Sequence, residues 1–318
     1  MTAVTRLGFD KVKSAGRELA PFELVVETGD GGEQRLLARA VIDASGTWSS
    51  PNPLGSSGVP LVGERQLRRH LTYRIPDALG SDRDRYAGKR TLVVGSGHSA
   101  FNALLDLAAL SEVAPETRLT WALRRDEVGL LFGGGTRDAL SARGSLGERL
   151  RQHVAAGAIE MALGFRARHL GEAPSGGVQM AGNDGRILGP FDEVVATTGF
   201  RPDLALTREL RLSLDAWLES PVELAPLIDP NVHSCGTVYP HGAKELAHPE
   251  RDFYVVGMKS YGRAPTFLLL TGYEQVRSVV AQLAGDARAA SEVHLVLPET
   301  GVCVTDLAAG ASPCCVAN

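Results

Sequence analysis

One stretch, RTLVVGSGHSAFNALLDLAAL at residues 90–110, constrains the fold of this chain more than any other. A short apolar strand pattern runs into a glycine-rich turn and straight on into an amphipathic helix pattern. The turn reads Gly95-Ser96-Gly97-His98-Ser99-Ala100. In such a unit the two glycines permit a tight turn and close approach of backbone to a diphosphate, while free N–H groups at the helix start favour the anion. We therefore predict that this turn binds a dinucleotide; the alternative is a purely structural turn.

Strand and helix patterns alternate beyond this turn. RLTWALR at 118–124 predicts a second strand, SLGERLRQHVAAG at 145–157 a helix, and AIEMALGFRARHL at 158–170 a third extended piece. Such alternation is typical of a parallel, doubly wound sheet. The fold class is therefore α/β.

Composition limits the kinds of partner. A chain of 318 residues with 44% apolar residues can form two well-buried cores. Its 33 basic and 37 acidic residues give a net charge of −4 without long runs of one sign, which disfavours nucleic acid and membrane surfaces as partners. No apolar run approaches the roughly 18 to 20 residues of a membrane span, and the opening residues lack a signal core. We expect a cytoplasmic protein with a small-molecule substrate.

Two segments of the chain echo each other. VIDASGTWSSPN at 41–52 and VVATTGFRPD at 194–203 each follow a hairpin pattern with an apolar strand, small residues, a glycine and an aromatic residue. The second segment closes the unit that opens at Gly95, so the first is expected to close a unit that opened earlier. No fingerprint for that earlier unit precedes it in the chain.

Four motifs in this order resemble the flavoproteins with two dinucleotide-binding domains, which include flavin-containing monooxygenases and thioredoxin-reductase-like enzymes. The motifs are VIDASGTW, VVGSGHSA, VVATTGFRPD and FYVVGMKSYG with its following helix, and the resemblance covers residues 6–285. The monooxygenase side fits better, because the inserted region has no Cys-x-x-Cys pair. The resemblance implies a Rossmann-like NAD(P)H domain inserted in an FAD domain, with FAD and NADPH as cofactors.

The same resemblance implies the division of the chain. Residues 1–88 would be the remainder of the first FAD-domain segment, 89–205 the NADPH-binding domain, 206–285 the return to the FAD domain and 286–318 a C-terminal tail. The family's first Gly-x-Gly-x-x-Gly, which holds the FAD diphosphate, would precede residue 1. We therefore expect an N-terminally incomplete FAD domain.

Two arginines indicate the choice of nicotinamide cofactor. The second strand ends in Arg124 and Arg125, where an enzyme that uses NAD would present Asp or Glu to the ribose hydroxyl. A guanidinium suits a 2′-phosphate through its charge and planar fork, so NADPH is favoured. Two ordinary surface arginines are the alternative.

The resemblance implies that three loops pass the cofactors. They comprise Ser45, Gly46, Thr47, then Thr198 and Gly199, and then Gly257, Met258 and Lys259. The alternative is that these segments are ordinary turns at strand ends, with Lys259 in solvent.

Several histidines and cysteines invite other interpretations. His98 could touch phosphates or flavin, or be a solvated loop residue, and His70 occupies roughly the place of a histidine in the monooxygenase signature. His233, Cys235, His241 and His248 do not have the spacing of paired zinc ligands, so we expect no metal. Cys303, Cys314 and Cys315 lie in the tail, where vicinal thiols could serve a metalloid or disulfide reaction; a disordered tail is the preferred interpretation.

The sequence thus predicts an NADPH-dependent flavoprotein oxidoreductase, monooxygenase-like, in which hydride passes from NADPH to FAD and electrons then reach dioxygen. A reductase of a disulfide or of an arsenic-linked metalloid, acting through the tail cysteines, and a non-catalytic nucleotide-binding remnant are the alternatives. The sequence identifies no catalytic side chain and no substrate. It leaves open whether the chain forms a homodimer.

Overall fold

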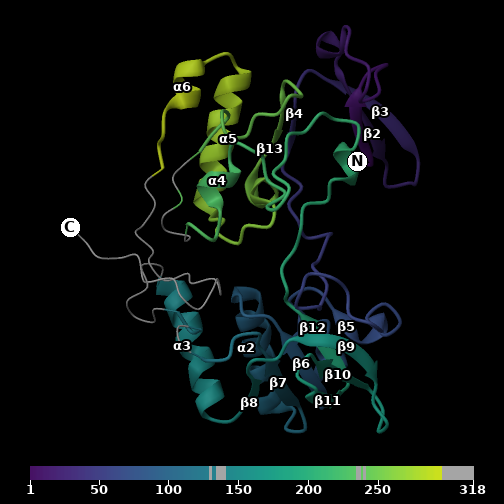
Figure 1. Ribbon diagram of the computed structural model, residues 1–318, viewed down its shortest axis with the longest axis vertical. Helices are drawn as coiled ribbons and strands as arrows, with labels where there is room; N and C mark the ends of the chain where they lie inside the picture. Colours follow the sequence, from purple (N-terminus) through teal and green to yellow (C-terminus); the bar gives the residue numbers. More distant parts are fainter. Residues whose placement is uncertain (129–130, 134–140, 234–237, 239–240, 296–318) are drawn as a thin grey trace, which may run out of the picture. The chain divides into compact units, whose positions relative to one another are not determined.

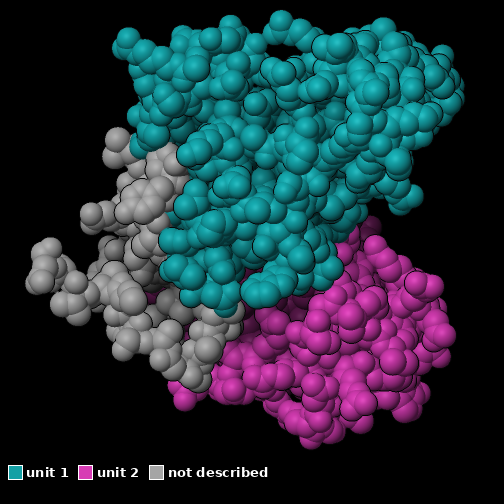
Figure 2. All heavy atoms as spheres, turned by 45° about the horizontal axis from the view of Figure 1, so that its top comes forward, with its two compact units in different colours: residues 1–50, 200–318 teal, residues 51–199 magenta. Residues whose placement is uncertain are grey.

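A computed structural model describes residues 1–128, 131–133, 141–233, 238 and 241–295. The chain forms two compact units, coloured separately in Figure 2. Unit 1 consists of Met1–Ser50 with Phe200–Asn318, and unit 2 consists of Pro51–Gly199. Unit 2 is therefore inserted between two segments of unit 1. None of the helices in the described part of the chain combines the length and apolar character needed to cross a membrane.

Unit 2 is built on a five-stranded parallel sheet (Figure 1). The strands, in spatial order, are β5 (Leu71–Thr72), β12 (Glu193–Ala196), β6 (Arg90–Val94), β7 (Arg118–Ala122) and β8 (Ile159–Ala162). Strand side chains alternate between the two faces of a sheet. Val93, Trp121 and Val195 accordingly pack with helices α2 (His98–Val113) and α3 (Ser141–Ala155).

A second, antiparallel sheet covers the opposite face of the parallel sheet. It comprises β9 (Ala167–Glu172), β10 (Val178–Gly182) and β11 (Ile187–Phe191). Its residues Leu170, Val178 and Met180 share a core with Leu92 and Val194 of the parallel sheet. The doubly wound pattern predicts helices on both faces of the parallel sheet. The structure has helices on one face and this antiparallel sheet on the other.

Unit 1 contains a short parallel pair of strands, β4 (Val41–Asp43) and β13 (Phe253–Val255). One face packs on the antiparallel sheet of β1 (Ala3–Arg6), β2 (Phe22–Glu27) and β3 (Glu33–Ala38). The other face packs with α4 (Ala225–Ile228) and α5 (Leu269–Leu283). Short helices complete the unit: η1 (Arg17–Leu19), η4 (Ala205–Thr207), η5 (Gly257–Tyr261) and α6 (Ala287–Ser291); unit 2 adds η2 (Arg68–His70) and α1 (Arg83–Tyr86).

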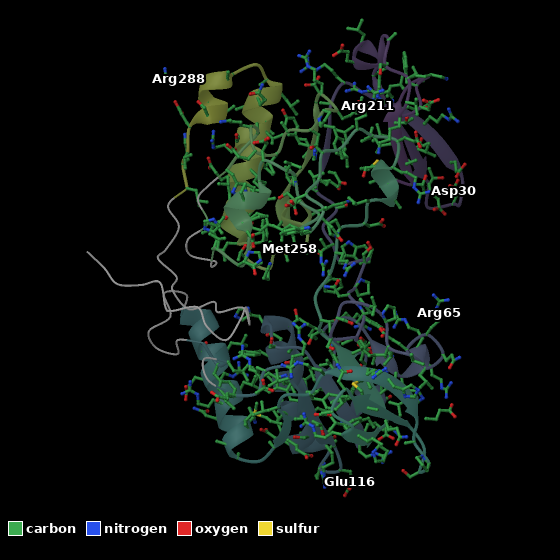
Figure 3. All side chains as sticks on the ribbon, viewed as in Figure 1. Asp30, Arg65, Glu116, Arg211, Met258 and Arg288 are labelled. Carbon is green, nitrogen blue, oxygen red and sulfur yellow. The ribbon has the colours of Figure 1, made fainter. Side chains whose placement is uncertain are left out.

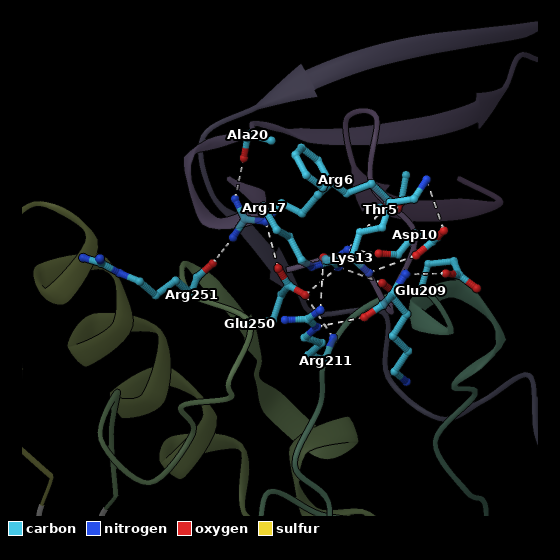
Figure 4. Close-up of polar contacts among 12 residues, drawn as sticks. Thr5, Arg6, Asp10, Lys13, Arg17, Ala20, Glu209, Arg211, Glu250 and Arg251 are labelled. Atoms are coloured by element: carbon cyan, nitrogen blue, oxygen red, sulfur yellow. Dashed lines mark hydrogen bonds and ion pairs between the residues drawn. The ribbon is translucent and has the colours of Figure 1, made fainter. Parts of the chain in front are cut away.

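A buried charge cluster joins the two segments of unit 1 (Figure 4). Glu250 accepts from Arg6 Nε and from Arg17 Nη2, each at 2.8 Å, and from the Arg211 backbone N–H at 3.0 Å. The three charged side chains are at most 4% exposed. Because Arg6 and Arg17 come from the first segment and Glu250 from the last, these bonds hold the segments together.

The structure departs from the sequence expectations at three boundaries. The linker expected to belong with residues 1–88 packs into unit 2 instead, because Leu54, Leu61 and Leu67 enter the core beneath β6 and β12. The single extended piece at 158–170 breaks at Gly164, whose φ is +63°, into β8 and β9, which join different sheets. The last long helix, which the sequence pattern predicts from Thr266, begins at Leu269.

Candidate functional site

The turn after β6 brings two strand ends into close contact. Gly95 has a φ of +133°, and a Cβ atom there would lie 2.4 Å from the backbone oxygen of Thr197. The Gly95 carbonyl in turn accepts from the buried indole of Trp121 at 2.7 Å. Only glycine allows this approach, because both the backbone conformation and the space exclude a side chain.

Gly97 plays a different part in the same turn. It is the N-cap of α2 and has an ordinary φ of −85°. A Cβ atom there would meet nothing within 4 Å, so the space above the start of α2 is open. Ala100 is fully buried, which lets α2 lie close to the sheet. An open helix N-terminus with no capping side chain on Gly97 is suited to an anion such as a diphosphate.

The turn lies at the point where the strand order reverses. β6 is flanked by β7, which follows it in sequence, and by β12, which returns from the far end of unit 2. Ligands of open α/β sheets bind at the carboxyl ends of strands at such a switch point. Ser96, Gly97 and His98 are exposed there and Ser99 is partly buried.

The loop after β12 completes this edge of the sheet. The hydroxyl of Thr197 donates to Val94 O at 2.8 Å, and that of Thr198 donates to Asn52 O at 2.8 Å. The Asn52 side chain donates back to Thr198 O at 3.1 Å, and its backbone N–H donates to Gly199 O at 2.9 Å. Asn52 was not identified from the sequence, because the Ser-Ser-Pro-Asn-Pro run indicates a turn there but not which loop the asparagine would hold.

The two predicted phosphate-binding arginines lie just after β7, which ends at Ala122. Arg124 is exposed and donates to Ser56 O at 3.1 Å, whereas Arg125 is partly buried and its Nη1 lies 3.4 Å from Val128 O. Asp126, which is 73% exposed, forms a 3.5 Å ion pair with Arg166 from the turn before β9. The charges at this edge are therefore mixed, with Arg166 an additional cation that the sequence did not single out.

Two other predicted histidines have local roles. The ring of His98 lies edge-on to Phe101 at a centroid distance of 5.9 Å, beside the start of α2. His70 Nδ1 lies 2.8 Å from the backbone oxygen of Asp192, at the opposite, amino end of β12. His70 is therefore placed away from the turn that starts at Gly95.

In unit 1, a buried ion pair joins the last residue of β4 to the loop after β13. Lys259 Nζ lies 2.7 Å from Asp43 Oδ2 and donates to Ser45 Oγ at 3.1 Å. The hydroxyl of Ser45 donates to Asp43 Oδ1 at 2.7 Å. The ammonium group of Lys259 is thus buried rather than in solvent, and its partner Asp43 was not identified from the sequence.

The remaining residues predicted on the flavin side lie in the same two loops. Gly46 has a φ of +72° and Thr47 is buried, while Met258 is 41% exposed (Figure 3). Gly257 has a φ of +70° and open space where a Cβ would be. Its N–H donates to the buried side chain of Gln275 on α5 at 2.7 Å, so this amide is already engaged within the protein.

The described part of the chain shows no candidate metal-binding cluster. No group of three or more His, Cys, Asp or Glu side chains is placed there to hold an ion. His248 is partly buried, and the desolvation of its ring lowers its pKa to about 4. Cys235, Cys303, Cys314 and Cys315 lie outside the described residues.

Comparison with curated proteins finds relatives by sequence, although no family model matches the chain. The ferredoxin–NADP reductase 1 of Cupriavidus necator is 30% identical over 183 residues, which are 57% of this chain and 44% of that protein. The ferredoxin–NADP reductase of Ralstonia pickettii is 34% identical over 134 residues, 41% of this chain and 31% of that protein. The match spans less than half the length of these curated relatives.

Solved structures share the fold. A cadaverine monooxygenase of the desferrioxamine pathway from Erwinia amylovora, bound to FAD, has a TM-score of 0.59 at 12% identity, covering 93% of this chain and 71% of that one. The bacillithiol disulfide reductase of Bacillus cereus has a TM-score of 0.55 at 17% identity, covering 90% and 68%. The chain thus shares the fold of these two proteins, and its unit 2 is inserted between two segments of unit 1.

Proposed function

We propose that this chain is an NADPH-dependent flavoprotein oxidoreductase of the monooxygenase type. The observation that carries the proposal is the turn at residues 95–100, placed at the switch point of a parallel sheet with an open helix N-terminus. Unit 2 would bind NADPH there, with the loop that contains Thr198 and Gly199 beside it. FAD, when bound, accepts the hydride of NADPH and supplies the electrons that activate dioxygen.

The residues of unit 2 fit NADPH. The N–H groups at the start of α2 would receive the diphosphate, and Gly97 leaves space for it. Arg124 and Arg125 lie after the neighbouring strand β7, where a 2′-phosphate is recognised in this class of fold. Asn52 would act indirectly, because its bonds hold the loop after β12 in place.

The residues of unit 1 fit the side of a flavin rather than its diphosphate. The loops after β4 and β13 carry glycines with positive φ at Gly46 and Gly257, and the space at Gly257 is open. No second Gly-x-Gly-x-x-Gly turn between a strand and a helix occurs in the sequence. We propose that these loops, fixed by the Asp43–Lys259 pair, contact FAD through their backbone.

The electron acceptor separates two candidate functions. Unit 2 contains no cysteine, so a redox disulfide inside the inserted unit cannot receive the electrons. This favours dioxygen. A protein electron carrier is the second candidate, because both curated relatives are named ferredoxin–NADP reductases. Oxygen-dependent and anaerobic, ferredoxin-dependent oxidation of NADPH by the FAD-loaded protein distinguish the two acceptors.

Replacing Gly97 by aspartate tests the NADPH site directly. Aspartate is a good N-cap, and its Cβ has room, so the unfolding free energy should hold or rise. Its carboxylate would occupy the anion position and should weaken NADPH binding, measured by calorimetry, by about 100-fold or more. Gly29→Asp is the matched control, because Gly29 has similar open space in unit 1. Equal NADPH affinity in Gly97→Asp and Gly29→Asp would rule out this site.

A further inference from the structure

The loop between β13 and α5 is held by a buried hydrogen-bond network that belongs to α5. Gly257 N–H donates to Gln275 Oε1 at 2.7 Å, and the hydroxyl of Ser260 donates to Gly257 O at 2.8 Å. Gln275 Nε2 lies 2.9 Å from Ser260 Oγ and 2.9 Å from His241 Nε2. Gln275 and Ser260 are fully buried and His241 is 4% exposed.

The direction of each bond in this network is fixed by chemistry. A backbone N–H can only donate, so the amide oxygen of Gln275 must face Gly257 and its nitrogen must face His241. An amide nitrogen can only donate, so His241 Nε2 must accept. The network therefore requires a neutral imidazole whose proton is on Nδ1.

We propose that Gln275 and neutral His241 are positioning residues for the loop at 257–260, and that protonation of His241 releases this loop. A protonated imidazole has no acceptor on Nε2. Rotating the amide of Gln275 would not restore the network, because its nitrogen would then oppose the N–H of Gly257. That the released loop is a flavin contact rests on the function proposed above.

Titratable and charged groups lie on each of the elements around His241. On η5, the Tyr261 ring lies 5.4 Å from the His241 ring, and Lys259 is paired with Asp43. On α5, Glu274 is paired with Arg277. On the loop of His241 itself, Glu245 accepts from Gly242 N–H at 2.9 Å. Lys259, Glu274 and Glu245 thus each have a partner of their own.

The proton position is the first test and needs no cofactor. Two-bond ¹H–¹⁵N correlation of the imidazoles in the full chain should report His241 as neutral at neutral pH, with the proton on Nδ1. A proton on Nε2 under these conditions would overturn the proposal, because Gln275 could not then donate to it.

Amide exchange tests the release of the loop. As His241 becomes protonated, the protection of the Gly257 amide, corrected for the intrinsic rate, should fall about tenfold, the value of one net hydrogen bond. His241→Gln places an amide oxygen near the position of Nε2 and should remove this pH dependence, whereas His153→Gln in unit 2 should keep it. The same loss of protection in wild type and His241→Gln would contradict the proposal.

A third variant covers the case in which His241→Gln does not fold. Gln275→Glu supplies a carboxylate that accepts from a protonated imidazole, so His241 should titrate at higher pH than in the wild type. If the titration midpoint of His241 in Gln275→Glu were unchanged or lower, the proposed hydrogen-bond network would be contradicted. If the loop responds as expected but FAD added to the chain does not bind, the flavin assignment fails while the positioning role stands.

Discussion

Lys259 Nζ and Asp43 Oδ2 lie 2.7 Å apart, with 1% and 2% of their side chains exposed. Asp43 is the last residue of β4 and Lys259 lies in η5 after β13; these two strands are parallel neighbours that are far apart in the sequence. A buried charge is costly without its partner, so each residue requires the other. The pair therefore joins the two segments of unit 1 at the loops that we assign to the flavin.

Breaking this pair should destabilise unit 1 strongly. Asp43→Asn leaves a buried ammonium without its counter-charge and should lower the unfolding free energy by about 3 to 5 kcal/mol, measured by urea denaturation. The double variant Asp43→Leu with Lys259→Met should recover much of this loss, because no unpaired charge remains. Arg35→Ala, which breaks the exposed pair with Glu23, is the control and should cost under about 1 kcal/mol. If Asp43→Asn left the unfolding free energy unchanged, the ion pair would not be required for stability.

Acid should weaken the cluster around Glu250. Burial raises the pKa of Glu250, but the hydrogen bonds from Arg6, Arg17 and the Arg211 amide outweigh it and hold the pKa below the usual 4.5. The unfolded state then binds the proton more readily, so the stabilisation is complete above about pH 4.5 and is lost as the pH falls through the lower, folded value.

Glu250→Gln should therefore flatten the acid limb of the unfolding curve and destabilise the protein at neutral pH by about 3 to 5 kcal/mol. Part of the acid sensitivity should survive, because the hydrogen bonds of Arg90 also lower the pKa of Asp192 in unit 2. Urea midpoints measured between about pH 3 and pH 7 give both quantities. If Glu250→Gln lost stability in acid as steeply as the wild type, other carboxylates would be responsible for the acid sensitivity.

The sequence predicts those parts of the fold that depend on local patterns. The strand, turn and helix around Gly95, and the hairpin of β2 and β3, follow from glycine positions and apolar periodicity. The boundary at residue 50 could not be predicted, because Leu54 and Leu61 lie in a Gly- and Pro-rich stretch and are buried only by tertiary packing. The partners of Lys259 and Gln275 were missed for the same reason, since their contacts join distant segments.

Cofactor preference should depend on the arginines after β7. Replacing Arg124 and Arg125 by alanine should weaken NADPH binding by roughly 1.5 to 3 kcal/mol, the value of charge-assisted hydrogen bonds to a 2′-phosphate, and leave NADH nearly unchanged. Asp126→Asn is a useful companion, because it removes a negative charge from the same edge and should not weaken NADPH binding. Equal losses for NADPH and NADH would mean that neither arginine recognises the 2′-phosphate.

The two glycines of the turn should respond to substitution in opposite ways. At Gly95, alanine would need a φ near +133° and would place its Cβ 2.4 Å from Thr197 O, so the strand ends must separate. We expect Gly95→Ala to lower the unfolding free energy of unit 2 by about 2 kcal/mol or more, through strain and overpacking. At Gly97, aspartate meets open space and caps α2, so stability should hold while NADPH binding falls. Urea denaturation followed by tryptophan fluorescence, to which Trp121 beside Gly95 contributes, measures the effect on stability, and calorimetry with NADPH measures the effect on binding. If Gly95→Ala unfolded at the same midpoint as the wild type, the contact between the ends of β6 and β12 would not be the reason for glycine at this position.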